Sequence, residues 1–208
     1  MATTDDPRSA ESEERARQMF GPGPRRLRWT ADQYYRLAEL GFFRNRRVEL
    51  IGGDIIEMSA VKPPHSIGID LLGDALRAAF GPGHRVRIQQ PLDMGRRTQP
   101  EPDAAVVAGE ARDFIEHPTT ALLVVEVSDS SLRYDRRVKS HYYAHAGIAD
   151  YWIVNLIDRQ LEIYRKPGPD PSRAGRLAYA EVTIVPPTGS ASPPAKPDAV
   201  IAVVDLLP

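Results

Sequence analysis

The segment at residues 121–127, ALLVVEV, constrains the fold more than any other part of the chain. Six of its seven residues are apolar, which is typical of a strand buried on both faces of a sheet. Such a strand needs cover on each side, so the sequence predicts a sheet with a helix on each face. Glu126 lies near the end of this run, and a buried carboxylate needs a charged partner or a bound cation.

Helical and strand patterns alternate along the rest of the chain, which predicts an α/β fold with a mixed central β-sheet flanked by helices. Thr30 and Gln33 form a capping-box pattern at the start of the first helix. A hairpin is predicted around Gly52-Gly53. Helices are predicted at residues 30–41, 65–81 and 130–147, and further strands at 84–95, 102–108, 121–127, 150–155, 160–166 and 176–185.

The predicted domain organisation is simple. Residues 1–25 carry too little apolar content for a fixed core and are expected to be a disordered or loosely ordered tail. Residues 26–208 are expected to form a single domain. Within it, the Pro-rich segments near 167–176 and 186–198 are predicted to be irregular.

Composition excludes several classes of protein. The formal net charge is -1, so any site for a polyanion has to be a local basic patch. The chain has no cysteine, which excludes disulfides and thiolate metal sites. No apolar run reaches the roughly 18–20 residues that span a bilayer, and the first residues lack the apolar core of a signal peptide. The expectation is a cytoplasmic protein without membrane contact.

Three residues could form a site for phosphate chemistry. Asp103 precedes one predicted strand, Glu126 lies in the next, and Lys139 is on the following helix with Asp135 one turn before it. Two carboxylates on neighbouring strands can hold Mg²⁺, which lowers the pKa of a bound water and neutralises phosphate charge. A nearby lysine can orient the attacking water. The alternatives are a surface ion pair for Asp135 and Lys139, and a paired core carboxylate for Glu126.

Three stretches resemble the Uma-two family of restriction endonucleases, which belongs to the PD-(D/E)XK nuclease superfamily and is widespread in bacteria. They are VELIGGDIIEMSAVKPPH, PEPDAAVV and LLVVEVSDSSLRYDRRVKSHYYAHAGIADYWIV, and the resemblance covers roughly residues 30–165. It implies a restriction-endonuclease-like core and a divalent metal, Mg²⁺ or Mn²⁺. It also implies that DNA is the substrate.

The resemblance also assigns residues. The Pro-Asp motif of the family falls on Pro102-Asp103, and its strand carboxylate falls on Glu126. The superfamily's usual lysine position is Ser128 here, so Lys139 is expected to replace it. Glu49 is implied as a further catalytic residue and metal ligand. His65, which otherwise reads as a helix cap, is implied as a secondary site residue, as is Asp135.

Basic clusters along the chain are either solvated surface or a phosphate-binding rim around the cleft. The residues predicted for such a rim are Arg87, Arg133 and Arg136. The function predicted from sequence is therefore a metal-dependent DNA endonuclease. Two alternatives stay open: an inactive nuclease-fold module that binds or regulates, and a metal hydrolase for another phosphate ester. Cleavage of both strands needs two sites, which favours a homodimer.

Overall fold

The computed structural model describes residues 15, 19 and 23–208 of the chain. Most of the tail predicted at residues 1–25 lies outside the described residues, and the single domain at 26–208 stays a prediction. The predicted mixed sheet is confirmed. It has six strands in the order β3-β4-β5-β6-β7-β8. Their bounds are β3 His84–Ile88, β4 Ala104–Ala108, β5 Leu123–Ser128, β6 Asp150–Asn155, β7 Gln160–Pro169 and β8 Leu177–Val185.

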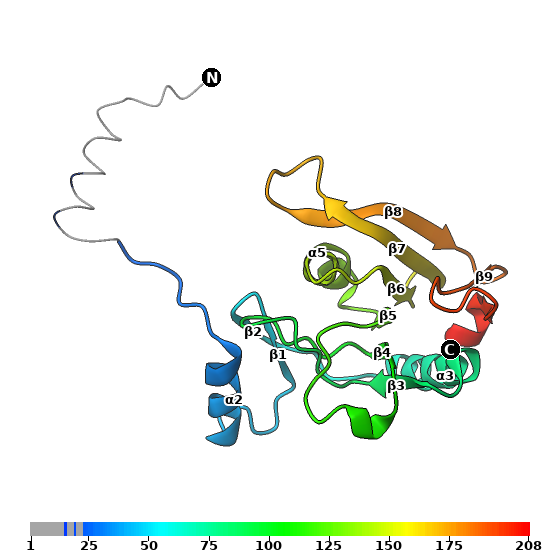
Figure 1. Ribbon diagram of the computed structural model, residues 1–208, viewed down its shortest axis with the longest axis horizontal. Helices are drawn as coiled ribbons and strands as arrows, with labels where there is room; N and C mark the ends of the chain where they lie inside the picture. The colour runs from blue at the N-terminus through cyan, green and yellow to red at the C-terminus, as the bar shows by residue number, and fades with distance from the viewer. Residues whose placement is uncertain (1–14, 16–18, 20–22) are drawn as a thin grey trace.

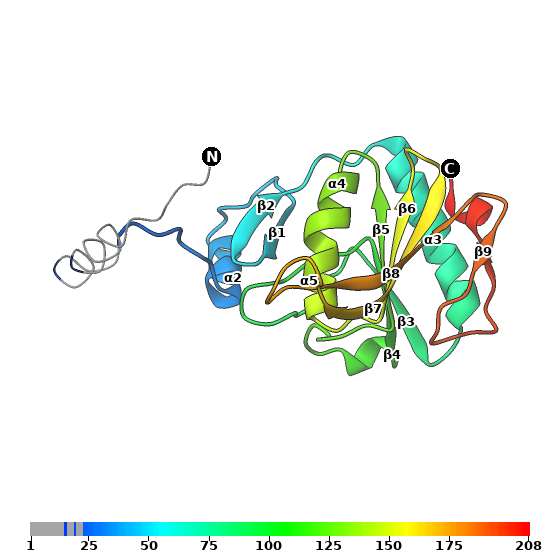
Figure 2. The same ribbon diagram turned by 90° about the horizontal axis from the view of Figure 1, so that it is seen from above.

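Neighbouring strands of this sheet run antiparallel except for β5 and β6, which are parallel. Parallel strands need a crossover connection, and here a helix on one face provides it. The helix consists of α4 (Leu132–Tyr134), a π-helical turn η2 (Asp135–Lys139) and α5 (Ser140–His145). Helix α3 (Pro63–Phe80) covers the other face. Figure 2 shows the sheet nearly edge-on between these two helices.

The core has two halves because the sheet has two covered faces. On the α3 side, Leu72, Leu76 and Phe80 pack with Trp152 and other sheet residues. On the α4–α5 side the residues of β5 and β6 that point the other way pack beneath the helix. Strand β5 is buried along its whole length, as the run at residues 121–127 predicted.

The first described elements form a small layer beside the sheet (Figure 1). Helix α2 (Ala31–Glu39) begins with the predicted capping box of Thr30 and Gln33. The predicted hairpin consists of β1 (Val48–Ile51) and β2 (Asp54–Glu57), joined by Gly52-Gly53. Tyr34 of α2 donates a hydrogen bond to the Val48 carbonyl (2.8 Å), which joins helix and hairpin.

Two strand boundaries differ clearly from the prediction. The strand predicted at 84–95 ends at Ile88. The loop predicted at 167–176 starts later, because Pro167–Pro169 continue β7 and pair with β8. Strand β6 pairs with β7 only as far as Arg165, so the prolines lie where one edge of β7 has no partner among the described strands. Proline has no backbone N–H, and on that edge its absence removes no hydrogen bond between strands.

The last described residues form only short elements. Their short elements are β9 (Ser190–Ala191), β10 (Ile201–Ala202) and the 3₁₀ turn η3 (Val203–Leu206); a further 3₁₀ turn, η1 (Ala111–Asp113), follows β4. Within the described part of the chain, no helix combines the length and apolar character needed to cross a membrane.

Candidate active site

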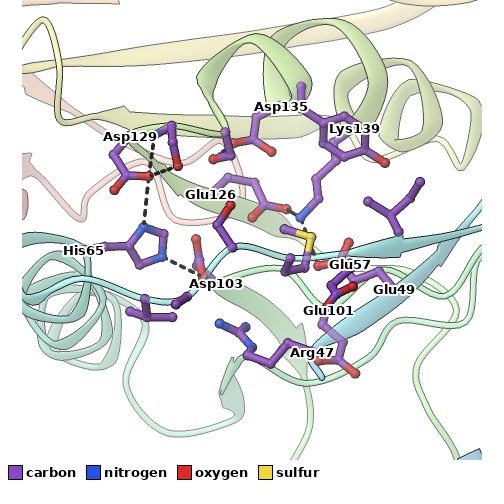
Figure 3. Close-up of a pocket in the computed structure, with 18 residues that line it drawn as sticks. Arg47, Glu49, Glu57, His65, Glu101, Asp103, Glu126, Asp129, Asp135 and Lys139 are labelled. Carbon is purple, nitrogen blue, oxygen red and sulfur yellow. Dashed lines mark hydrogen bonds and ion pairs between the residues drawn. The ribbon is translucent and has the colours of Figure 1, made fainter. Parts of the chain in front are cut away.

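A pocket lies where the β1–β2 hairpin, the start of α3, the start of β4, the end of β5 and the π turn meet (Figure 3). It collects five of the predicted site residues together with the lysine: Glu49, His65, Asp103, Glu126, Asp135 and Lys139. The other polar residues that line it are Arg47, Glu57, Ser59, Glu101, Asp129, Ser130, Ser131 and Tyr134.

Lys139 is the direct partner of Glu126. Its Nζ donates to Glu126 Oε1 (2.9 Å) and to Glu49 Oε1 (3.2 Å), and all three side chains are buried. Tyr143 Oη also donates to Glu126 Oε1 (2.6 Å). The carboxylate in the apolar run thus meets a lysine and a phenol, as Figure 3 shows for Lys139.

Burial and charge act in opposite directions on this group. Burial raises the pKa of Glu126 well above its ordinary value, although the charge of Lys139 opposes that shift. Burial also raises the pKa of Glu49. Burial alone would lower the pKa of Lys139, but attraction to Glu126 and Glu49 outweighs it and the pKa rises. Lys139 is therefore a charged lysine held by two carboxylates.

Asp103 lies level with Glu126 on the neighbouring strand, because Ala104 pairs with Val125 in the antiparallel ladder. Its Oδ2 accepts the Val127 backbone N–H (2.9 Å) and its Oδ1 lies 3.4 Å from His65 Nε2. Burial favours a higher pKa for Asp103, yet the hydrogen bond and charge of His65 lower it. The hydrogen bond to Asp103 in turn raises the pKa of His65.

Asp135 is held by two hydroxyls. Its Oδ2 accepts from Ser128 (2.7 Å) and Ser131 (2.6 Å), and its Oδ1 is buried with no hydrogen-bond partner among the described residues. Ser128 occupies the position where the superfamily usually has lysine. Here that position binds the helix carboxylate, and the lysine comes from the other end of the same π turn. Such turns are frequent at functional sites.

The predicted arginines do not all reach the pocket. Arg87 is buried beside Phe114 and donates to the Pro91 carbonyl (3.3 Å), away from the pocket lining. Arg136 binds Glu162 through two hydrogen bonds (2.9 and 2.5 Å). Arg133 is exposed and lines a shallow depression next to the pocket, together with Arg136.

Sequence reasoning missed several pocket residues. Arg47 was not among the arginines predicted for the rim, and it lines the pocket. Glu101 stands two residues before Asp103, so the double Pro-acid pattern PEPD is the signal that could have found it. Asp129 follows Glu126 by three residues and faces His65 at 4.0 Å. The Tyr143 hydroxyl gave no signal, because tyrosine in a helix usually indicates packing.

The donor chemistry of the pocket fits a hard divalent cation. Seven carboxylates line it, against one lysine, one arginine and one histidine. Within the described part of the chain, Glu49 Oε2 and Asp135 Oδ1 are buried oxygens that accept no hydrogen bond, and oxygen ligands are what Mg²⁺ prefers. A converged ligand shell is not formed: among the described residues, no three histidine, aspartate or glutamate side chains are grouped as metal ligands.

Comparison with known proteins gives a consistent result. The model of the Uma2 family, described as "Putative restriction endonuclease", matches residues 31–203. A crystal structure from Anabaena variabilis ATCC 29413, described as "a putative nuclease belonging to DUF820", is similar with a TM-score of 0.65. The two chains are 16% identical, and the match covers 85% of this chain and 96% of that one, which shows the fold. No curated protein matches the chain.

Proposed function

The chain belongs to the Uma2 family of restriction-endonuclease-like proteins, and from this premise we propose that it is a Mg²⁺- or Mn²⁺-dependent endonuclease that hydrolyses phosphodiester bonds in DNA. One observation carries the proposal: Asp103, directly before β4, lies level with Glu126 of the adjacent strand β5, and both line a single acid-rich pocket with Lys139. Pairs of carboxylates with a nearby lysine suit hydrolysis at phosphorus.

Asp103, Glu126 and Glu49 are the proposed ligands. When bound, the cation supplies Lewis-acid polarisation of the phosphate and neutralises its charge. Asp103 is held in place by the Val127 N–H, and Glu126 by the Tyr143 hydroxyl, so both carboxylates are fixed before substrate arrives. Lys139 orients the attacking water and offsets the negative charge that develops on phosphate.

The proposed contacts to the DNA backbone are arginines near the pocket. Arg47 lines the pocket itself, and Arg133 and Arg136 line the adjoining depression. Their charges attract phosphate, while the carboxylates inside the pocket repel it until a cation is bound. Arg87 is no longer part of this rim, because its guanidinium is buried beside Phe114.

A cleavage assay tests the function. Supercoiled plasmid and short duplexes are incubated with purified protein in Mg²⁺, in Mn²⁺ and in chelator. We expect cutting by wild type in either metal, and its loss in Asp103→Asn and Glu126→Gln. The matched controls, Asp74→Asn and Glu39→Gln, change exposed acids on α3 and α2 and should cut like wild type. Equal cutting by Glu126→Gln and Glu39→Gln would exclude the site.

A second function is an inactive nuclease-fold module that binds nucleic acid without turnover. Lys139 is engaged by two carboxylates, and the described acids do not form a ready ligand group. This module would bind DNA equally well in chelator and never cut it.

A hydrolase for another phosphate ester is tested in the same assay. RNA and nucleotides are offered as parallel substrates, and this separates DNA cleavage from hydrolysis of another phosphate ester.

A further inference from the structure

Strand β8 forms one end of the central sheet, and its outer edge is free of other described segments. In Figure 1 it is the outermost strand, and in Figure 2, seen from above, it lies in front of the sheet. The strand is nine residues long, and residues 180–184 are all exposed. Val182 and Ile184 keep 52% and 50% of their surface in solvent.

The two ends of the sheet differ in composition. Natural edge strands are usually short or carry charges, because an open row of backbone groups can pair with another chain. Strand β3, at the opposite end, has five residues and includes Arg85 and Arg87. Strand β8 has one charged residue, Glu181, which is paired with Lys166 of β7 (2.5 Å). The β8 edge therefore lacks the usual protection against pairing.

We propose that β8 pairs with β8 of a second copy of this chain, antiparallel about a two-fold axis at Val182. In this register Val182 opposes its own copy, Ala180 opposes Ile184, and Glu181 opposes Thr183. No like charges face one another, and branched apolar side chains meet across the strands. The match of the strand to itself is why a second copy, rather than an unrelated peptide, is the occupant.

The pairing joins two six-stranded sheets into one continuous sheet. The two-fold axis is perpendicular to the sheet, so both α4–α5 helices and both pockets lie on the same face. The β5 strands of the two copies stand seven strand spacings apart, roughly 34 Å at about 4.8 Å per spacing. This dimer does not depend on the proposed function, because molar mass reports it without any assay of activity.

Molar mass tests the interface first. Light scattering over micromolar concentrations should give twice the chain mass of 23.1 kDa for wild type. Val182→Lys sets two ammonium groups opposite each other and should weaken the dimer about tenfold or more. The control Val204→Lys adds the same charge at an exposed site in η3 and should leave the dimer intact. A wild type that stays monomeric, or a dimer unaffected by Val182→Lys, overturns the proposal.

Crosslinking tests the register without a destabilising charge. The chain has no cysteine, so a single Val182→Cys variant gives one defined thiol. Directly opposed residues in an antiparallel pair have Cα atoms about 4.5–5.5 Å apart, within the range of a disulfide. Mild oxidation should give a covalent dimer for Val182→Cys and little for Val204→Cys. Equal crosslinking of both, or none at Val182, contradicts the proposed pairing.

Discussion

At the scale of single residues, Lys139 decides how the pocket is held together. A lysine with 2% of its side chain exposed remains charged because two carboxylates, Glu49 and Glu126, neutralise it. Removing one member of a buried ion pair is costly, since the remaining charge has no counter-ion. The group contains two acids and one base. Loss of the base therefore leaves two buried acids without a counter-ion, whereas loss of one acid still leaves the base paired with the other.

Lys139→Met keeps most of the apolar stem and removes the charge. We expect the free energy of unfolding to fall by about 3–5 kcal/mol at neutral pH, because Glu49 and Glu126 then face each other unpaired. Urea denaturation measures this. The control Lys166→Met removes an exposed lysine from its pair with Glu181 and should cost less than about 1 kcal/mol. Similar losses in both variants would show that Lys139 does not stabilise the pocket.

The sequence alone was enough to single out some of these residues as candidates for the pocket, but not others. Glu126 was singled out because burying a carboxylate in an apolar strand is costly. The cost is offset only if a charged or hydrogen-bonding partner lies next to the carboxylate. Glu49 was assigned only through the family resemblance. Strand alternation could not place it, because Glu49, Leu50 and Ile51 are all buried in succession. Strand β1 is covered on both faces by contacts that local sequence does not encode.

At the scale of elements, the π turn is held from outside the pocket. Arg136 lies between Asp135 and Lys139 in the turn and binds Glu162 of β7 bidentately. Glu162 is buried and also accepts from Asn155 (2.7 Å) and Tyr164 (2.9 Å). Burial alone would raise the pKa of Glu162, but the hydrogen bonds from Arg136 and Asn155 lower it.

The lowered pKa of Glu162 determines how its contribution to the free energy of unfolding changes with pH. Its carboxylate stabilises the fold fully above the unfolded pKa, near 4.5, and loses this contribution as pH falls through the lower folded pKa. Glu162→Gln should therefore be about 2–4 kcal/mol less stable than wild type at pH 7, and the gap should shrink in acid. Denaturation at pH 7 and pH 3.5 measures it. Glu181→Gln, in an exposed pair, should show little difference at either pH. A gap for Glu162→Gln that is independent of pH contradicts the assignment.

The hairpin that carries Glu49 is positioned by a close contact with the helix. Gly52 has φ +59, and a Cβ there would lie 1.8 Å from the Tyr142 hydroxyl oxygen. Gly52→Ala should therefore cost backbone strain and also displace Tyr142, for a total above about 2 kcal/mol. Gly175→Ala has a similar φ of +75 with no atom nearby, and should cost only the strain. Thermal melts compare the two, and equal losses would show that the contact is not tight.

Element by element, local chemistry was a good guide where it is strong. The capping box, the Gly-Gly hairpin and the buried β5 run are confirmed because each has a local physical cause. The π turn was not predicted, since its residues DRRVK read as ordinary helix. The extension of β7 through Pro167–Pro169 was also missed, because its tolerance of proline depends on where β6 stops pairing.

At the scale of the whole molecule, the predicted α/β architecture is confirmed: helix α3 covers one face of the central sheet and the α4–α5 helix covers the other. The pocket exists because the parallel pair β5 and β6 needs a crossover helix. That helix returns across the face beside Glu126 and carries Lys139 to it. Topology thus joins residues far apart in the sequence. The residues themselves suggested Asp103, Glu126 and Lys139 as one group, whereas Glu49 was added only by the family resemblance.

The excess of carboxylates in the pocket makes the stability of the whole chain sensitive to divalent cations. A cation that binds only the native state raises stability by mass action, by about 2.7 kcal/mol at a hundredfold excess over its dissociation constant. For a chain of this size that shift corresponds to several degrees in melting temperature. We expect Mg²⁺ or Mn²⁺ to give this shift in wild type and in Asp74→Asn, and Na⁺ at equal ionic strength to give none.

The same melts identify the ligands, without any assay of cleavage. In Glu126→Gln the amide oxygen can still accept from Lys139 and Tyr143, while Glu49 remains as the counter-ion of the lysine. Removing one of several crowded negative charges relieves repulsion. The variant should therefore be at least as stable as wild type without metal, and Mg²⁺ or Mn²⁺ should no longer stabilise it. If Glu126 is instead only a structural partner of Lys139, Glu126→Gln loses stability and wild type melts at the same temperature with and without the cation, a result that would remove the metal from the proposed site.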